Sequence, residues 1–284
     1  IIYLEEKDNN LGEVVVHGKP TFTEKQKMRA FKEQFLGMST AGFSCKILNE
    51  GVIRLVYDPE ENKLHGYASA PIEIENKYLG YFISWELIEF TLTLNSNIKS
   101  LNNNNIGIVS IVGAALFKET KTDVVTAERR EFAFNVSKRN FFKLIADRAI
   151  EGSNFKILIP DKKITELPAS NWFKITQKSS DRQETTIAMN PNRKDSLGII
   201  YMWVQQRSNH MPTPTSSPRN TNAPKYSSST STFSELFFMI DTFKVDNYGN
   251  TNIIKELATT GEMGSQRIGD MLPFNYLPHT TDNW

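Results

Sequence analysis

Apolar residues recur along this chain at two spacings, and the longer spacing predicts an amphipathic helix over residues 24–36. Large apolar side chains there stand three to four positions apart, which places them on one helical face. Thr23 and Gln26 have the spacing of a capping box, and Gly37 is a typical helix stop. An apolar stripe of the same kind predicts a second helical region over residues 127–150.

Most other segments alternate apolar and polar residues with a period of two, which is typical of strands. Strands are predicted over residues 52–57, 63–70, 71–75, 78–94, 106–117, 155–159, 172–176, 185–189 and 197–204, and again from residue 233. Short strands separated by turns favour antiparallel pairing over a parallel architecture. The sequence therefore predicts an α+β fold, predominantly antiparallel β, with two main helical segments.

Within residues 78–94 the apolar positions change phase. Up to Leu87 the alternate residues share a face with Trp85, and from Ile88 onward they share a face with Phe90. Side chains alternate strictly along a regular strand, so a change of phase requires an extra residue or new surroundings. We predict a β-bulge between Leu87 and Ile88, or a passage of the strand between two sheet environments.

Residues 207–232 differ in kind, because Pro, Ser, Thr and Asn replace nearly all apolar residues there. Such a segment buries too little apolar surface to offset the entropy lost on ordering, so a mobile surface loop is predicted. The longest apolar stretch, residues 106–117, is predicted to be a buried strand. It is shorter than the about 20 residues that a membrane-spanning helix needs.

Composition and charge narrow the function classes. The 284 residues are 39% hydrophobic and 11% aromatic, which is enough for a packed core. Lys and Arg number 33 and Asp and Glu 32, and this net charge of +1 gives no support for binding to nucleic acid or an anionic membrane. The chain opens at Ile1 without a start Met or a signal-peptide pattern, so we expect the mature part of a longer protein.

Residues that usually carry catalysis form no recognisable motif. None of the four histidines, His17, His65, His210 and His279, has a partner at i+3 or i+4 of the kind seen in helical zinc sites. Cys45 is the single cysteine, and its neighbours indicate a small buried core residue rather than an activated nucleophile. The sequence thus predicts a protein that is not an enzyme, with no catalytic residue, no metal site and no cofactor.

The tryptophans leave one alternative open. Trp85 and Trp203 alternate with other apolar residues, which favours core packing. For Trp172 the pattern does not decide between core and surface, and acidic pairs such as Glu73 and Glu75 could face a sugar. A glycan-binding or glycan-processing envelope protein is therefore the alternative function.

Several separated segments resemble one family. They are residues 35–37 (FLG), 45–49 (CKILN), 71–81 (PIEIENKYLGY), 246–250 (DNYGN) and 267–278 (RIGDMLPFNYLP). Together they make residues 11–278 similar to Bacteroidota proteins described as carboxypeptidase-like regulatory domain-containing proteins. Residues 133–137 (AFNVS) depart from the aromatic-x-Gly-Ser pattern expected of that family.

This resemblance implies export to the periplasm or the outer membrane. It implies that residues 1–20 are the exit strand and linker of a preceding transthyretin-like β-sandwich. It also implies that residues 21–284 form a single mainly-β domain, interrupted by the loop at 207–232. The family name reflects the likeness of that sandwich to an accessory domain of true carboxypeptidases, whose zinc sites need a His with Glu three positions later. No His of this sequence has that neighbour.

Glu13, Val14, Val15 and Val16 resemble the segment that follows the regulatory sandwich in SusC-like transporters, where a TonB-contacting strand lies. Three successive valines strongly favour a strand, so these residues are the candidate interface strand for β-augmentation. We expect a non-catalytic interaction or scaffold subunit of a Bacteroidota outer-membrane protein assembly, facing the periplasm. Its expected partners are outer-membrane or periplasmic proteins, with no nucleic acid and no transmembrane segment of its own.

Overall fold

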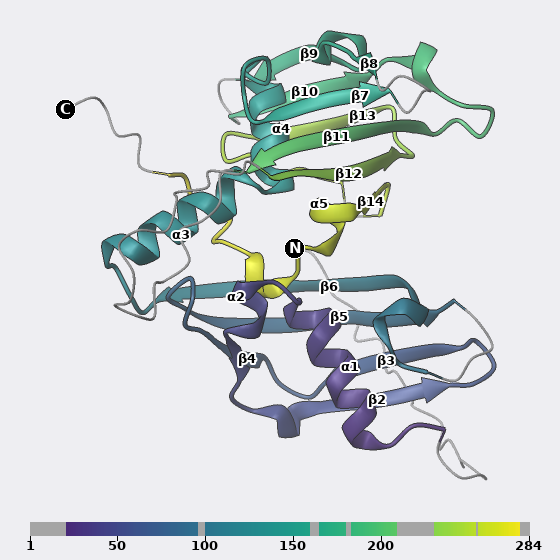
Figure 1. Cartoon of the computed structure of the whole chain (residues 1–284), viewed down its shortest axis with the longest axis vertical. Coiled ribbons are helices and arrows are strands. Elements are labelled where there is room, and N and C mark those ends of the chain that lie inside the picture. The colour runs from purple at the N-terminus through teal and green to yellow at the C-terminus, as the bar shows by residue number, and fades with distance from the viewer. Residues whose placement is uncertain are drawn as a thin grey trace, which may run out of the picture.

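The computed structural model describes residues 21–95, 100–159, 165–179, 183–208, 230–253 and 255–278. It confirms the predicted α+β fold with mostly antiparallel strands. Two halves lie one above the other in Figure 1, an N-terminal half (residues 21–119) and a C-terminal half (residues 138–265). Helix α3 (Val124–Asn135) connects them, and residues 266–278, named the closing segment, return to the N-terminal half.

The N-terminal half is an antiparallel sheet with helices on one side (Figure 1). Its elements are α1 (Glu24–Leu36), α2 (Thr40–Phe43), β1 (Cys45–Ile47), β2 (Ile53–Asp58), β3 (Lys63–Ala68), β4 (Ile72–Asn76), β5 (Tyr81–Leu94) and β6 (Ile106–Glu119). The strand order is β1-β4-β5-β3-β2, and β6 also pairs with β5. Because β4 and β3 share one edge of β5 and β6 fills the other, the whole sheet is built on β5.

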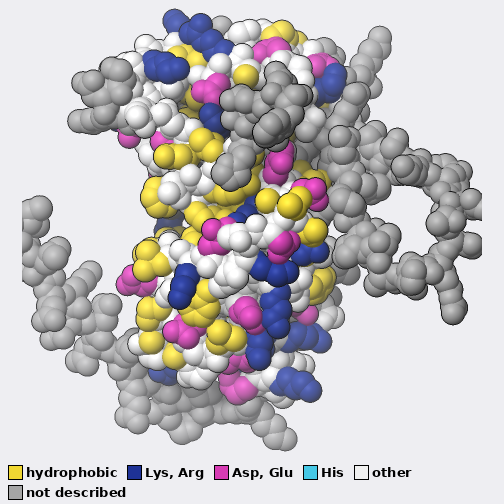
Figure 2. Space-filling model, turned by 90° about the vertical axis from the view of Figure 1, so that its left-hand side faces the viewer, with side chains coloured by type: hydrophobic (Ala, Val, Ile, Leu, Met, Phe, Trp, Pro, Cys, Tyr) yellow, Lys and Arg dark blue, Asp and Glu magenta, His cyan; other side chains and the backbone are white. Residues whose placement is uncertain are grey.

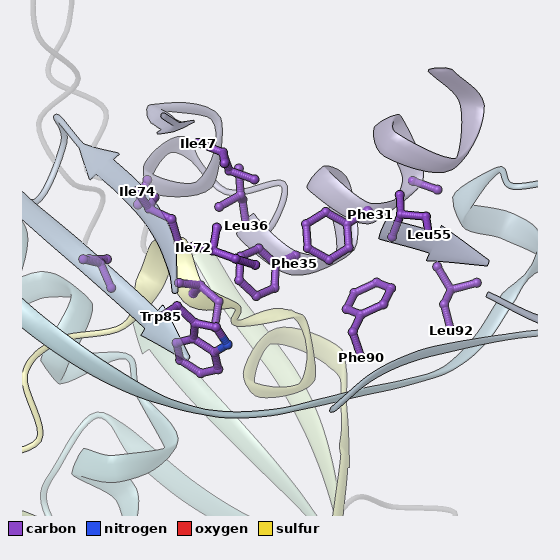
Figure 3. Close-up of a cluster of buried hydrophobic side chains, with 14 of the residues drawn as sticks. Phe31, Phe35, Leu36, Ile47, Leu55, Ile72, Ile74, Trp85, Phe90 and Leu92 are labelled. Carbon is purple, nitrogen blue, oxygen red and sulfur yellow. The ribbon is translucent and has the colours of Figure 1, made fainter. Parts of the chain in front are cut away.

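Helix α1 begins and ends where the sequence predicts. The Thr23 hydroxyl accepts from the Gln26 N–H at 3.3 Å, and Gln26 Oε1 accepts from the Thr23 N–H at 2.8 Å, which completes the capping box. The ring centroids of Phe31 and Phe35 lie 4.8 Å apart, and those of Phe31 and Phe90 4.6 Å apart (Figure 3). Full burial of such a side chain contributes about 1.5–3 kcal/mol, so this apolar face fixes the helix on the sheet.

The change of phase in β5 is a β-bulge, which confirms that alternative. The register with β6 shifts between Leu87 and Glu89, so Ile88 is the extra residue. As a result Trp85 before the bulge and Phe90 after it both point toward α1 and both are buried (Figure 3). The bulge therefore keeps two apolar runs of opposite phase in one core.

The C-terminal half packs helix α4 (Lys138–Ala146) against two antiparallel sheets. Its other elements are β7 (Phe155–Ile159), β8 (Thr165–Glu166), β9 (Phe173–Ser179), β10 (Glu184–Met189), β11 (Ile200–Ser208), β12 (Thr230–Phe238), β13 (Thr242–Asp246), β14 (Leu257–Thr260) and α5 (Gly261–Ser265). The strand orders are β13-β10-β9 and β14-β12-β11-β7-β8. Phe141 and Phe142 of α4 are buried, and edge-on ring contacts join Phe142 to Phe238 of β12 and Phe243 of β13.

The helical region predicted over residues 127–150 is two helices rather than one. Val136 follows the last residue of α3, and Ser137 caps α4 by accepting the Asn140 N–H at 3.0 Å. A serine hydroxyl that takes up a free amide at a helix start favours a new helix over a continued one. The chain can therefore turn between the two halves at this point.

Two strand boundaries also differ from the sequence prediction. The run that begins at residue 233 is two strands, β12 and β13. Strands β11 and β12 pair as far as Ser208 and Thr230, so both extend into the predicted loop. The remainder of that loop, residues 209–229, lies outside the described residues.

The closing segment joins the two halves. Ile268 and Leu272 are buried in the N-terminal core, although they follow the whole C-terminal half in sequence. Gly269 lies close against the helices, since an added Cβ would meet the Gly42 Cα and the Leu36 carbonyl oxygen at 2.5 Å each.

On the face shown in Figure 2, hydrophobic side chains reach the surface near the junction of the halves. Each half has its own core, and their folding as one domain stays a prediction.

We expect Gly269→Ala to lower the free energy of unfolding by about 1–3 kcal/mol, because the added methyl group meets backbone atoms that cannot rotate away. Urea unfolding followed by circular dichroism measures the change. Gly51→Ala is the matched control, since a Cβ there meets nothing within 4 Å, and its effect should stay within about 0.5 kcal/mol. Equal stability of Gly269→Ala and wild type would contradict the described packing of the closing segment.

Candidate functional site

Strand β6 presents the longest free sheet edge in the described part of the chain. Its 14 residues run along β5, and no other described strand pairs with it. In an antiparallel pair, alternate residues direct their N–H and C=O groups away from the partner strand. A row of backbone donors and acceptors therefore faces outward from β6 and can receive a further strand.

One face of β6 continues the N-terminal core without closing it. Ile111 lies opposite the buried Phe90, and Ala115 lies opposite the buried Trp85. Both residues pack against the core yet stay partly exposed. Within the described residues no strand lies beyond them, so the core is incompletely covered at this edge.

The opposite face of β6 holds apolar side chains in contact with solvent. Ile108 and Leu116 are 72% and 78% exposed. Val112 lies on the same face as Leu116, because side chains alternate along this regular part of the strand. Nearer Ile108 the register with β5 shifts between Ile106 and Val109. Ile88, at the bulge of the neighbouring strand, is also exposed. Exposed large apolar residues beside an unpaired edge favour an interaction surface there.

Strand β6 lacks the features that usually protect an edge from pairing. Natural edge strands are short, or carry charged residues or proline. Residues 106–117 contain neither a charged residue nor a proline, and the first charge is Lys118. The edge strand β2 differs, because Lys27 Nζ donates to the Leu55 carbonyl at 2.9 Å. This contrast singles out β6 as the site for strand addition.

Glu89 of β5 contacts polar groups of two other elements beside this edge. Its carboxylate accepts from the Ser110 hydroxyl at 2.6 Å and forms an ion pair with Lys255 at 3.4 Å. The Ser110 hydrogen bond is the main cause that lowers the pKa of Glu89. Because Lys255 belongs to the C-terminal half, this contact shows that a part of that half lies near the middle of β5 and β6.

The interface strand predicted from the sequence, Glu13, Val14, Val15 and Val16, lies outside the described residues. It stays a prediction. The prediction that residues 106–117 form a buried strand is wrong, because no residue of β6 is fully buried. The apolar run of residues 106–117 correctly predicted a strand. The sequence did not reveal that, among the described strands, this strand pairs only with β5 and so lies at a sheet edge.

The segments that resemble the Bacteroidota family meet at the closing segment. Asn76, at the end of β4, donates its side-chain amide to the Gly269 carbonyl at 2.9 Å. Asn250 donates its side-chain amide to the Phe274 carbonyl at 2.8 Å. These two bonds come from opposite halves, so the resembling residues form the junction of the fold and not the β6 edge.

Arg139 holds the end of the closing segment. Its guanidinium donates to the Pro273 carbonyl at 2.7 Å and to the Tyr276 carbonyl at 3.0 Å. Burial lowers the pKa of Arg139 to about 10 and raises the pKa of Tyr276 to about 12, so both keep their usual charge at neutral pH. The guanidinium also lies 5.1 Å from the Phe134 ring. Since two backbone carbonyls accept its hydrogen bonds, this partly buried cation fixes the end of the closing segment.

Cys45 lies beside the same junction. Its thiol donates to the Ala41 carbonyl at 3.3 Å, and the residue packs partly buried against the N-terminal core. Burial, with a smaller contribution from the nearby Asp270 carboxylate, raises the pKa of the thiol to about 12. A neutral, core-packed thiol agrees with the interpretation made from the sequence.

Two tryptophans bear on the alternative function in opposite ways, because Trp172 is buried and Trp203 is partly exposed. Trp172 is 2% exposed, and the Arg193 guanidinium lies 4.9 Å from its ring. Trp203, predicted to be a core residue, is instead partly exposed on the outer face of its sheet beside Phe233. The neighbouring Val204 takes the buried position, because successive residues of a strand face opposite sides.

Metal ligands are not grouped in the part of the chain that the structure describes. No set of three or more His, Cys, Asp or Glu residues there could hold a metal ion. His65 lies on β3 with a ring nitrogen 3.4 Å from the Thr91 hydroxyl, and His17, His210 and His279 fall outside the described residues. Among the described helices, none has both the length and the apolar character needed to cross a membrane.

Comparisons with known proteins neither support nor contradict the resemblance to the Bacteroidota family. No family model, curated protein or solved structure matches this chain. The membership in the Bacteroidota family therefore stays a prediction. In the proposed function, the family is supported only by the resembling segments, such as residues 71–81 and 267–278.

We expect the Cys45 thiol to react with a disulfide-based reagent at about pH 8 roughly a thousandfold more slowly in the native protein than in urea. A pKa of about 12 in place of 9.0 leaves about a thousandfold less thiolate, and the thiolate is the reacting form. Absorbance of the released thiol measures both rates. Native-state labelling as fast as in urea would contradict the partly buried position of the thiol and its raised pKa.

Proposed function

We propose that this chain is a non-catalytic interaction or scaffold subunit of a Bacteroidota outer-membrane protein assembly, facing the periplasm. We propose further that it binds an outer-membrane or periplasmic protein by strand addition along β6. The free 14-residue edge of β6 is the observation that carries this proposal. The resemblance of residues 71–81 and 267–278 to an exported family supports the compartment.

Strand addition along β6 uses backbone groups for affinity and side chains for selection. Each hydrogen bond formed with the outward edge contributes about 0.5–1.5 kcal/mol net. Apolar side chains of the added strand cover Ile111 and Ala115 on one face, and Ile108 and Leu116 on the other. Because residues 106–117 offer no countercharge, the partner segment is extended, apolar on both faces and uncharged at its centre.

The C-terminal half favours a single strand as the partner. In Figure 1 it lies beyond the β6 side of the sheet, and Lys255 of that half forms an ion pair with Glu89 of β5. A second whole sheet paired to β6 would extend toward that half, whereas one strand needs only about 5 Å. An extended tail or loop of the partner fits this arrangement.

Ile108→Lys combined with Leu116→Lys should reduce partner recovery at least about tenfold, because lysines on an edge strand oppose pairing. Both side chains are more than two thirds exposed, so the fold should be kept. Copurification from the native host at native expression level, quantified by mass spectrometry, measures the recovery.

Leu197→Lys is the matched control for this experiment. Leu197 is 80% exposed and lies in the turn before β11, away from the β6 edge. It should leave recovery unchanged, and circular dichroism should match for all three proteins. Recovery of a lone wild-type monomer, or equal recovery with the β6 variant, would contradict the proposal.

Glycan binding is the second candidate, and the exposure of Trp203 favours it. Trp203 and Phe233 lie on the outer face of one sheet, and Glu235 pairs directly with Trp203 on the neighbouring strand. Glu235, however, already accepts from the Tyr201 and Thr260 hydroxyls, so little of its hydrogen-bonding capacity remains for a sugar. On a glycan array, Trp203→Ala should abolish any signal of the wild type. A wild type that binds no glycan would remove this candidate.

A further inference from the structure

We propose that residues 11–16 of the chain itself occupy the free edge of β6, so that a partner strand must displace them to bind. This inference rests on the docking edge of the proposed function and adds its regulation. No described strand pairs with the outer edge of β6, so a segment outside the described residues can occupy it.

The composition of residues 11–16 suits that edge. They read LGEVVV, and three successive β-branched residues favour the extended conformation. Glu13 is the only acidic residue of the segment, and residues 106–117 carry no charge. Pairing the two segments therefore opposes no like charges, and it covers the apolar groups that β6 exposes.

The length of chain before α1 is enough for this placement. Phe22 lies beside β2, with its ring centroid 4.7 Å from that of Tyr57. The vacant position next to β6 is reached from β2 by way of β3, β5 and β6, at about 4.8 Å for each step or about 19 Å in all. Six extended residues, from Phe22 back to Val16, span up to about 20 Å. Residues 11–16 can then run along β6.

The nearer edge, that of β2, is less suitable. Lys27 of α1 already donates to the Leu55 carbonyl of β2, so that edge is partly covered. Strand β2 also ends in charged Asp58 and contains Arg54. Strand β6 offers a longer edge that is uncharged over residues 106–117, and it has partly exposed core residues such as Ile111 and Phe117 that an added strand would cover.

Native-state hydrogen exchange of the full chain tests this assignment with two variants. Val15→Pro removes a backbone donor and disfavours pairing, whereas Val15→Ile keeps the strand preference. The outward-facing amides of β6 should exchange at least about tenfold faster in Val15→Pro than in Val15→Ile or wild type. The β6 amides that face β5 serve as the internal control and should not change. Partner recovery should rise with Val15→Pro, because the competing strand is weakened.

Equal exchange in the three proteins would overturn the inference. Protection of the outward amides that grows with protein concentration would also overturn it, because a second copy would then supply the strand. Loss of the partner with Val15→Pro would make residues 11–16 the interface itself and not its competitor. The two proposals fail separately, since the outward amides can be protected without any partner, and a partner can be recovered while those amides exchange freely.

Discussion

The return of the closing segment to the N-terminal half is the constraint on which the two-part architecture depends. Ile268 and Leu272 complete a core whose other members precede them by well over a hundred residues. Gly269 allows the close approach, and Asn76 and Arg139 take up carbonyl groups of the segment. A buried carbonyl without a partner costs about 1–3 kcal/mol, so these donors stabilise the junction by preventing that penalty. The N-terminal core is therefore finished only when the chain has passed through the second half.

Strand β5 explains why β6 is an edge strand in the part of the chain that the structure describes. Its bulge at Ile88 turns two apolar runs of opposite phase toward a single core, which lets one long strand support β3 and β4 on one side. The other side is filled by β6 alone. A long strand with a neighbour on only one side leaves a row of backbone groups and half-covered apolar residues, and both are resolved by pairing with a further strand.

Several polar and reactive residues in the described part of the chain stabilise the junction between the two halves. Arg139 is engaged by backbone carbonyls, Asp270 accepts from the Ser39 hydroxyl, and Cys45 is neutralised by burial. Burial also raises the pKa of Asp270, as expected for a carboxylate withdrawn from water. The segments that resemble the Bacteroidota family lie at this junction, so the resemblance bears on the fold more directly than on a binding surface. The candidate binding edge consists of backbone and aliphatic side chains, which leave no short motif.

The sequence by itself determined the elements whose signals are local. Thr23, Gln26 and Gly37 set both ends of α1, because capping bonds join residues three or four positions apart. The period-two pattern located most strands, and the phase change located the bulge in β5. Only the tertiary structure decided which apolar residues are enclosed. Trp203 and Val204 are both apolar and face opposite sides of β11, so alternation could not tell which of them meets the core. The apolar run of β6 likewise could not reveal how many neighbours it has, because burial depends on strands that are distant in the sequence.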